Sequence, residues 1–214
     1  MKILIVTLSY FDNGVYSKFY QTQNKTWNSL DVNDIETYFL VGNKSENKIN
    51  GDILETNVSE SLINCGSKTL EAFKLLKGLD FDFIFRTNSS SYVDKKLLKD
   101  YLRDKPKKNF YSGVVGNHFG ISFSSGSGFI ITKDLVNLVL DKEKEWEHRL
   151  IDDVALGLLL RNYNVTPTPA PRYDITILND ETPLNFYHYR LKSHDRNIDM
   201  YRMEKLHEMK LNMK

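Results

Sequence analysis

The sequence contains a single cysteine, Cys65, among 214 residues. One cysteine excludes an intrachain disulfide framework and any CxxC motif for metal or redox chemistry. The sequence also lacks a large excess of positive or negative residues. It has 29 lysines and arginines and 28 aspartates and glutamates, for a net charge of +1. This balance excludes a global electrostatic attraction to nucleic acid or to an anionic membrane, and we expect no nucleic-acid partner.

Long apolar runs are missing too, and none approaches the roughly 20 residues that span a bilayer. We therefore expect no transmembrane segment. Residues 1–14 contain one lysine and a short apolar run, followed by polar residues without a small-residue cleavage site. This pattern is typical of a buried strand and not of a signal peptide, so we expect a cytoplasmic protein.

What is present is a regular alternation of apolar runs and amphipathic stretches in the first half of the chain. Strands are predicted by β-branched and aromatic runs at residues 2–10, 34–41, 49–56 and 81–86. Helices are predicted between them at residues 16–30 and 59–77, the second capped by Gly78. Strands that alternate with helices predict an open α/β sheet with parallel strands, whose ligands bind at the carboxyl ends of the strands.

The second half is richer in glycine, serine and aromatic residues. Residues 109–131 predict short strands with tight turns, and helices are predicted from Thr132 to Leu140 and from about residue 151 to 162. The prolines within residues 166–174 exclude a central strand there. No repeat or linker interrupts the chain, so we predict a single domain over residues 1–214.

The usual catalytic motifs are absent, including the Walker loop, GxGxxG, HExxH and GxSxG. Three polar constellations remain. Residues 86–94 (RTNSSSYVD) offer a guanidinium, an amide and hydroxyls to phosphate or sugar oxygens, or they form a turn that satisfies its own backbone. Residues 124–128 (SSGSG) allow close approach of a ligand, or they form an ordinary bulge. Asp152 and Asp153 begin a helix, where a carboxylate acts as a cap or as a general base.

In their order and spacing these segments resemble the Fringe and β-1,3-galactosyltransferase family. The resemblance covers roughly residues 2–165 and depends on degenerate matches at 24–27 (NKTW), 51–70, 81–87 (FDFIFRT), 125–131 (SGSGFII) and 151–157 (IDDVALG). It implies a GT-A fold, a Rossmann-like open mixed sheet with helices on both faces. Residues 1–94 would then form a nucleotide-binding half, residues 109–190 an acceptor and catalytic half, and residues 195–214 a C-terminal helix.

The resemblance also implies an inverting glycosyltransferase that moves a sugar from a UDP-sugar to an oligosaccharide or other glycan. Asp153 would be the general base that deprotonates the acceptor, with Asp152 as the second candidate. The remaining candidate residues would bind the donor: Thr7, Leu8, Ser9, Tyr10, Lys68, Arg86, Asn88, Ser90, Gly126, Ser127, Gly128, His188 and Lys192.

One departure from the family pattern concerns the metal. Where the family has three aspartates that hold a divalent cation, this sequence has Asn88, Ser89 and Ser90. An amide and hydroxyls do not supply the anionic oxygens that Mn²⁺ or Mg²⁺ prefers. If a metal binds, we expect it near Asn88, Ser90 and His188.

Two explanations of this departure remain open. Either the diphosphate is neutralised by other groups, among which the basic segment 187–196 is a candidate, or the domain is an inactive module that binds a sugar or nucleotide. A retaining transferase on the same fold is a third hypothesis.

Overall fold

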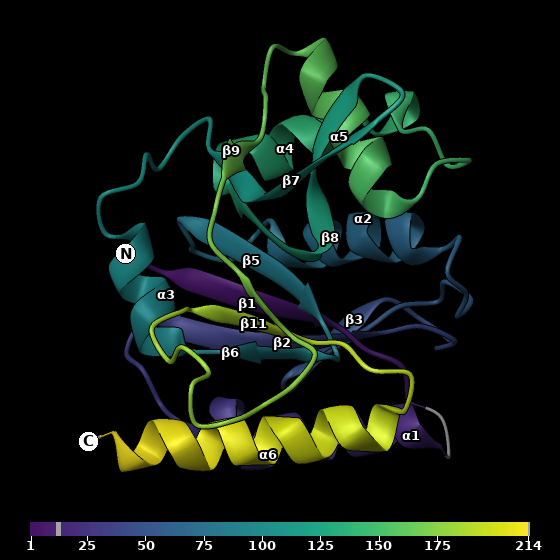
Figure 1. Ribbon diagram of the computed structural model, residues 1–214. Helices are drawn as coiled ribbons and strands as arrows, with labels where there is room; N and C mark the ends of the chain where they lie inside the picture. The colour runs from purple at the N-terminus through teal and green to yellow at the C-terminus, as the bar shows by residue number, and fades with distance from the viewer. Residues whose placement is uncertain (12–13, 214) are drawn as a thin grey trace.

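The computed structural model describes residues 1–11 and 14–213, and Figure 1 shows their arrangement. The strands are β1 (Ile3–Leu8), β2 (Ile35–Val41), β3 (Lys48–Asn50), β4 (Ile53–Glu55), β5 (Phe83–Asn88), β6 (Ser91–Val93), β7 (Tyr111–His118), β8 (Ile121–Thr132), β9 (Thr168–Pro169), β10 (Tyr173–Ile175) and β11 (His188–Leu191). The α-helices are α1 (Val15–Lys25), α2 (Cys65–Leu76), α3 (Lys95–Leu102), α4 (Lys133–Asp141), α5 (Asp152–Asn162) and α6 (Arg196–Asn212). Short 3₁₀ turns follow at Trp27–Ser29 and Glu143–Glu145.

An open mixed sheet forms the centre of the molecule. Its strand order is β3-β4-β2-β1-β5-β8-β7-β9, and β1 is parallel to both β2 and β5, while β8 is antiparallel to β5 and β7. A second sheet of three strands has the order β10-β11-β6. In the register of β1 and β5, Leu8 lies opposite Asn88, so both strands end at the same edge.

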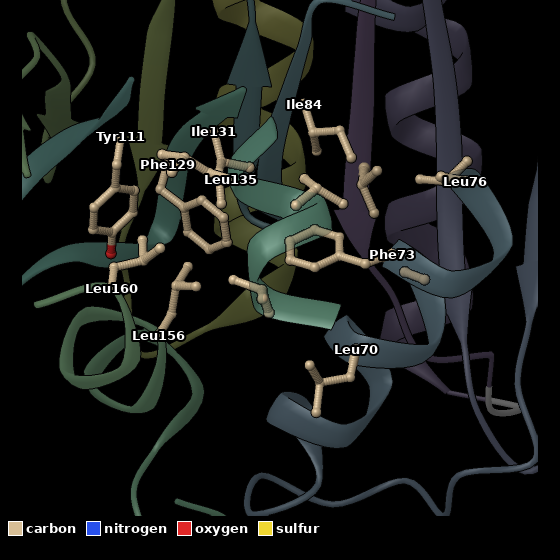
Figure 2. Close-up of a cluster of buried hydrophobic side chains, with 14 of the residues drawn as sticks. Leu70, Phe73, Leu76, Ile84, Tyr111, Phe129, Ile131, Leu135, Leu156 and Leu160 are labelled. Atoms are coloured by element: carbon tan, nitrogen blue, oxygen red, sulfur yellow. The ribbon is translucent and has the colours of Figure 1, made fainter. Parts of the chain in front are cut away.

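Both faces of the large sheet are covered by helices, as the sequence predicted. Successive residues of β1 alternate between two cores, with Leu4 and Val6 in one and Ile3 and Ile5 in the other. The first core packs the sheet against α2, α4 and α5, and Figure 2 shows Phe73 of α2, Leu135 of α4 and Leu156 of α5 meeting strand side chains. The second core contains the small sheet, α1, α3 and α6, and Figure 1 shows α6 along this side.

The predicted strands and helices of the first half are present, but several bounds differ. Residues 49–56 form a hairpin of β3 and β4 instead of one strand, because Gly51 has a φ of +61° that turns the chain. Gly78 has no left-handed φ and follows Lys77, the residue that ends α2. The first helix, predicted over residues 16–30, ends at Lys25, and a separate 3₁₀ turn follows it at Trp27–Ser29.

The second half differs more from its prediction. Residues 111–132 form one long hairpin of β7 and β8, with a register shift between Gly113 and Val115, instead of several short strands. Thr132 does not cap α4 with its side chain, and its Oγ1 accepts the N–H of Phe110 at 3.2 Å. Residues 95–102 form α3, whose N-terminus is capped by Asp94, and the prediction had no helix there. Prolines restrict β9 to two residues at the sheet edge.

Candidate functional site

A cleft of about 390 Å³ lies at the edge where β1 and β5 end. Six of the predicted donor-binding residues line it, namely Leu8, Ser9, Tyr10, Lys68, Asn88 and Ser90. The other lining residues were not among the predicted donor-binding residues; they are Tyr16, Phe19, Glu60, Ser61, Leu62, Cys65, Ser89 and Arg196. Polar residues that follow β1 and β5 therefore lie together at this edge of the sheet.

One wall of the cleft is aromatic. Tyr10 and Tyr16 are each 37% exposed, and the centroids of their rings are 5.9 Å apart. Leu62 also lines the cleft, and it is 79% exposed. Partly exposed rings, here one after β1 and one in α1, provide flat apolar surface on which a nucleobase can stack.

Lys68 is a buried cation in the floor of the cleft. Its ammonium donates to both oxygens of Glu60, at 2.8 and 2.7 Å, and to the carbonyl oxygen of Ser9 at 3.0 Å. Burial lowers the pKa of this ammonium, and the carboxylate of Glu60 opposes the effect. Lys68 therefore joins α2 to the end of β1 and is not a solvent-facing helical lysine.

The polar side chains of the turn after β5 form hydrogen bonds with one another and with the end of β1. The Oδ1 atom of Asn88 accepts the hydroxyls of Ser90 at 3.1 Å and Ser91 at 3.2 Å, and Ser89 donates to the carbonyl of Leu8 at 3.1 Å. Among residues 1–11 and 14–213, no cluster of three histidine, cysteine or acidic side chains is arranged to hold a metal ion. The residues present at this turn therefore do not fit the cation that the resemblance implies.

Arg86, on β5, organises a second polar group outside the cleft lining. Its guanidinium forms an ion pair with Asp152 and donates to the carbonyl oxygen of Gly126. Asp153 accepts the N–H of Gly126 at 2.7 Å and the N–H of Val154 at 2.9 Å. Asp153 is only 8% exposed, and burial raises its carboxyl pKa above the usual value.

Cys65 connects the cleft to this carboxylate group. It is the first residue of α2 and lines the cleft. Burial raises the pKa of its thiol, and the negative charge of Asp152 raises it further, while Arg86 and Lys68 lower it. The charges of Asp152 and Arg86 thus act on a side chain of the cleft.

His188 does not lie in the cleft. It is 1% exposed, its Nε2 is 3.0 Å from the hydroxyl of Ser91, and its ring fills the space beside Gly128. Burial lowers its pKa well below 6.5, and the charges of Arg172 and Arg190 lower it further. The imidazole is therefore neutral and buried, which removes it as the cation that the sequence assigned to a departing diphosphate.

Three other predicted donor-binding residues, Thr7, Lys192 and Ser127, do not line the cleft. Thr7 is fully buried within β1 and does not line the cleft. Lys192 is exposed and is also outside the cleft lining. Ser127 is buried in β8, where its hydroxyl accepts a hydrogen bond from Arg172. The sequence missed Arg172 because its partner lies 45 residues away along the chain.

No family model and no curated protein match the sequence. Solved structures with a similar fold include several glycosyltransferases. One is involved in the glycosylation of the major capsid of PBCV-1, with a TM-score of 0.57 and 11% identity, over 96% of this chain and 100% of that one. The galactosyltransferase LgtC, in complex with donor and acceptor sugar analogs, has a TM-score of 0.52 and 12% identity, over 99% and 96% of the two chains.

GlyE of Streptococcus pneumoniae TIGR4 has a TM-score of 0.53 and 12% identity, over 100% of this chain and 64% of that one. These likenesses identify a fold and do not single out the Fringe group. No helix in the described part of the chain has the length and hydropathy that crossing a bilayer requires. The chain has a single-domain GT-A-like fold, which it shares with these glycosyltransferases.

Proposed function

We propose that the chain is an inverting glycosyltransferase that moves a sugar from a UDP-sugar to a hydroxyl of a glycan in the cytoplasm. The observation that carries the proposal is the cleft at the shared edge of β1 and β5, on a fold common to several glycosyltransferases. In open α/β sheets this edge is where ligands bind. The aromatic wall of Tyr10 and Tyr16 would take the base of the nucleotide.

Asp153 is the carboxylate best suited to act as the base. Asp152 is neutralised by its ion pair with Arg86, whereas Asp153 is held by backbone N–H groups alone. Each of its oxygens keeps a lone pair, and its raised pKa makes it a better proton acceptor than an ordinary aspartate.

The proposed step breaks one bond and forms another at the anomeric carbon. An acceptor hydroxyl attacks this carbon, its proton passes to the carboxylate of Asp153, and the C–O bond to the diphosphate breaks with its electron pair on the leaving oxygen. Attack opposite to the leaving group inverts the anomeric configuration.

Replacement of Asp153 by asparagine tests the assignment. Because Asn keeps an oxygen that accepts one backbone N–H but is not basic, we expect turnover to fall about 10²- to 10⁴-fold. UDP affinity should stay within about twofold, since neither oxygen of Asp153 lines the cleft. The measurement is transfer from a panel of nucleotide-sugars, with the anomeric configuration of the product read by NMR.

The matched variant is Asp152→Asn. Near-full turnover of Asp153→Asn together with inactive Asp152→Asn would move the role of base to Asp152. A product with retained configuration would replace the inverting mechanism by a retaining one.

A second candidate function, an inactive module that binds a sugar or nucleotide, is favoured by one observation. The turn from Asn88 to Ser91 has no carboxylate, and its side chains bond to one another and to the backbone. UDP binding without transfer, under every metal and acceptor tried, would support this module.

A further inference from the structure

The turn at Asn88–Ser91 has no side chain that could neutralise a bound phosphate group. If the chain binds a UDP-sugar as proposed above, a diphosphate with two or more negative charges lies beside a turn of amides and hydroxyls. Lys68, which lines the cleft, is already paired with Glu60, and Arg86 of β5 is paired with Asp152. Another source of positive charge is needed.

Three arginines from separate segments meet next to this turn. Arg196, at the start of α6, lines the cleft. Arg172 precedes β10 and donates to the hydroxyls of Ser127 and Ser125. Arg190 lies opposite Ser91 in the pairing of β11 with β6, and the next residue of β11 donates its N–H to the carbonyl of Ser90.

The strand alternation places Arg190 on the side of β11 that faces the large sheet. Side chains two residues apart along a strand share a face. His188 therefore marks this face, and its ring lies against Gly128 of β8 and bonds to Ser91. Arg190 accordingly shares the face on which His188 meets β8, and its strand partner Ser91 directly follows Ser90, which lines the cleft.

The charges in this group do not balance. Arg172 pairs with Asp174, and Arg196 pairs with Asp199 at 2.9 Å. Within residues 1–11 and 14–213, the half-buried guanidinium of Arg190 forms no ion pair. Burial lowers the pKa of Arg190, the neighbouring charges of Arg172 and Arg196 lower it further, and only Asp174 opposes them. An anion placed there would relieve this repulsion.

We infer that Arg190, flanked by Arg172 and Arg196, binds the diphosphate of the donor in place of a metal ion. A guanidinium presents two parallel N–H donors that match the oxygens of a phosphate. Arg172 bonds to the serines on either side of Gly126, and Arg196 lines the cleft, so the charge that develops on the leaving oxygen would meet fixed cations. The inference depends on the proposed donor.

The test is calorimetric titration of UDP and of inorganic pyrophosphate into the full chain, with EDTA and then with Mn²⁺. We expect the wild-type chain to bind both ligands in EDTA. In Arg190→Gln both affinities should fall about tenfold to a hundredfold, the size of a lost hydrogen-bonded charge contact. Arg190→Lys should recover part of the loss, because it restores the charge but not the two-donor fork.

Two further variants complete the test, one as a control away from the site and one as a second change within it. Arg103→Gln removes an arginine at the end of α3 whose side chain is 70% exposed, and its affinities should equal those of the wild-type chain. Arg196→Gln changes the cleft's rim without touching β11 and should lower UDP affinity severalfold. Circular dichroism and thermal unfolding confirm that each variant is folded.

The outcomes separate this inference from the proposed function. Binding of UDP that needs Mn²⁺, or that Arg190→Gln and Arg196→Gln leave unchanged, overturns the arginine site and leaves a glycosyltransferase possible. Arginine-dependent binding of UDP and pyrophosphate without any sugar transfer supports the site and overturns the transferase. A chain that binds neither ligand under any condition overturns both.

Discussion

The ring of His188 occupies space that any side chain at position 128 would need. An ideal Cβ on Gly128 would lie 2.6 Å from the Nδ1 atom of His188. The variant Gly128→Ala must therefore shift the imidazole and disturb its hydrogen bond with Ser91. We expect a loss of about 1–3 kcal/mol in the free energy of unfolding, the usual cost of overpacking a well-filled core, measured by urea denaturation.

The control for this prediction is the same substitution in a His188→Ala background. Removal of the ring should leave room for the methyl group, so Gly128→Ala should then cost less than half of its effect in the wild-type chain. An equal cost in both backgrounds would show that the glycine matters for its backbone and not for the ring.

Single residues also show how far the sequence alone could predict the site. Lys68 was placed near the donor by its resemblance to a family motif, and it does line the cleft. Its partner Glu60 was not predicted, because the pairing depends on how the segment before α2 folds over β1. The arginines at 190 and 196 lay in a basic segment that the sequence marked. Only the pairing of β11 with β6 and the lining of the cleft show that these two lie near the turn.

At the scale of elements, the hairpin of β3 and β4 depends on one backbone angle. Gly51 has a φ of +61°, and nothing lies within 4 Å of the Cβ that an alanine would add. The cost of Gly51→Ala is therefore conformational, and we expect about 1 kcal/mol of destabilisation in chemical denaturation.

Gly78 provides the matched control, because an added Cβ there also meets nothing within 4 Å but the φ is not positive. Gly78→Ala should be neutral or stabilising by up to about 1 kcal/mol, since alanine restricts the unfolded chain more than glycine does. If both variants lose the same stability, the difference in backbone conformation is not what matters.

Local patterns were sufficient for elements that contact their neighbours in sequence. The buried runs of β1, β2 and β5 and the apolar faces of α2 and α5 were all found from composition and period. The small sheet was missed because its strands are three or four residues long and pair across large separations. Ser91 and His188, for example, are 97 residues apart. Short strands carry too few residues for a period to be recognised.

At the scale of the whole molecule, burial of a neutral imidazole between the two sheets links stability to pH. Burial, with the charges of Arg172 and Arg190, lowers the pKa of His188 well below 6.5. In the unfolded chain the imidazole titrates near its ordinary value. Below pH 6.5 the unfolded state therefore binds a proton that the native state does not, and the free energy of unfolding falls as the pH falls.

We expect His188 to have no effect on the free energy of unfolding well above pH 6.5. Below that pH it should lower this free energy by about 1.4 kcal/mol per pH unit, until the native imidazole also titrates. Asp153 acts in the opposite direction. Because burial raises its pKa, the native state binds its proton more readily than the unfolded state does, and the free energy of unfolding rises as the pH falls. Urea unfolding of the wild-type chain and of His188→Asn, between about pH 7.5 and about pH 5, isolates the histidine, since Asp153 is present in both. The wild-type chain should lose more stability than the variant over this interval, and parallel curves would show that His188 is not buried in its neutral form.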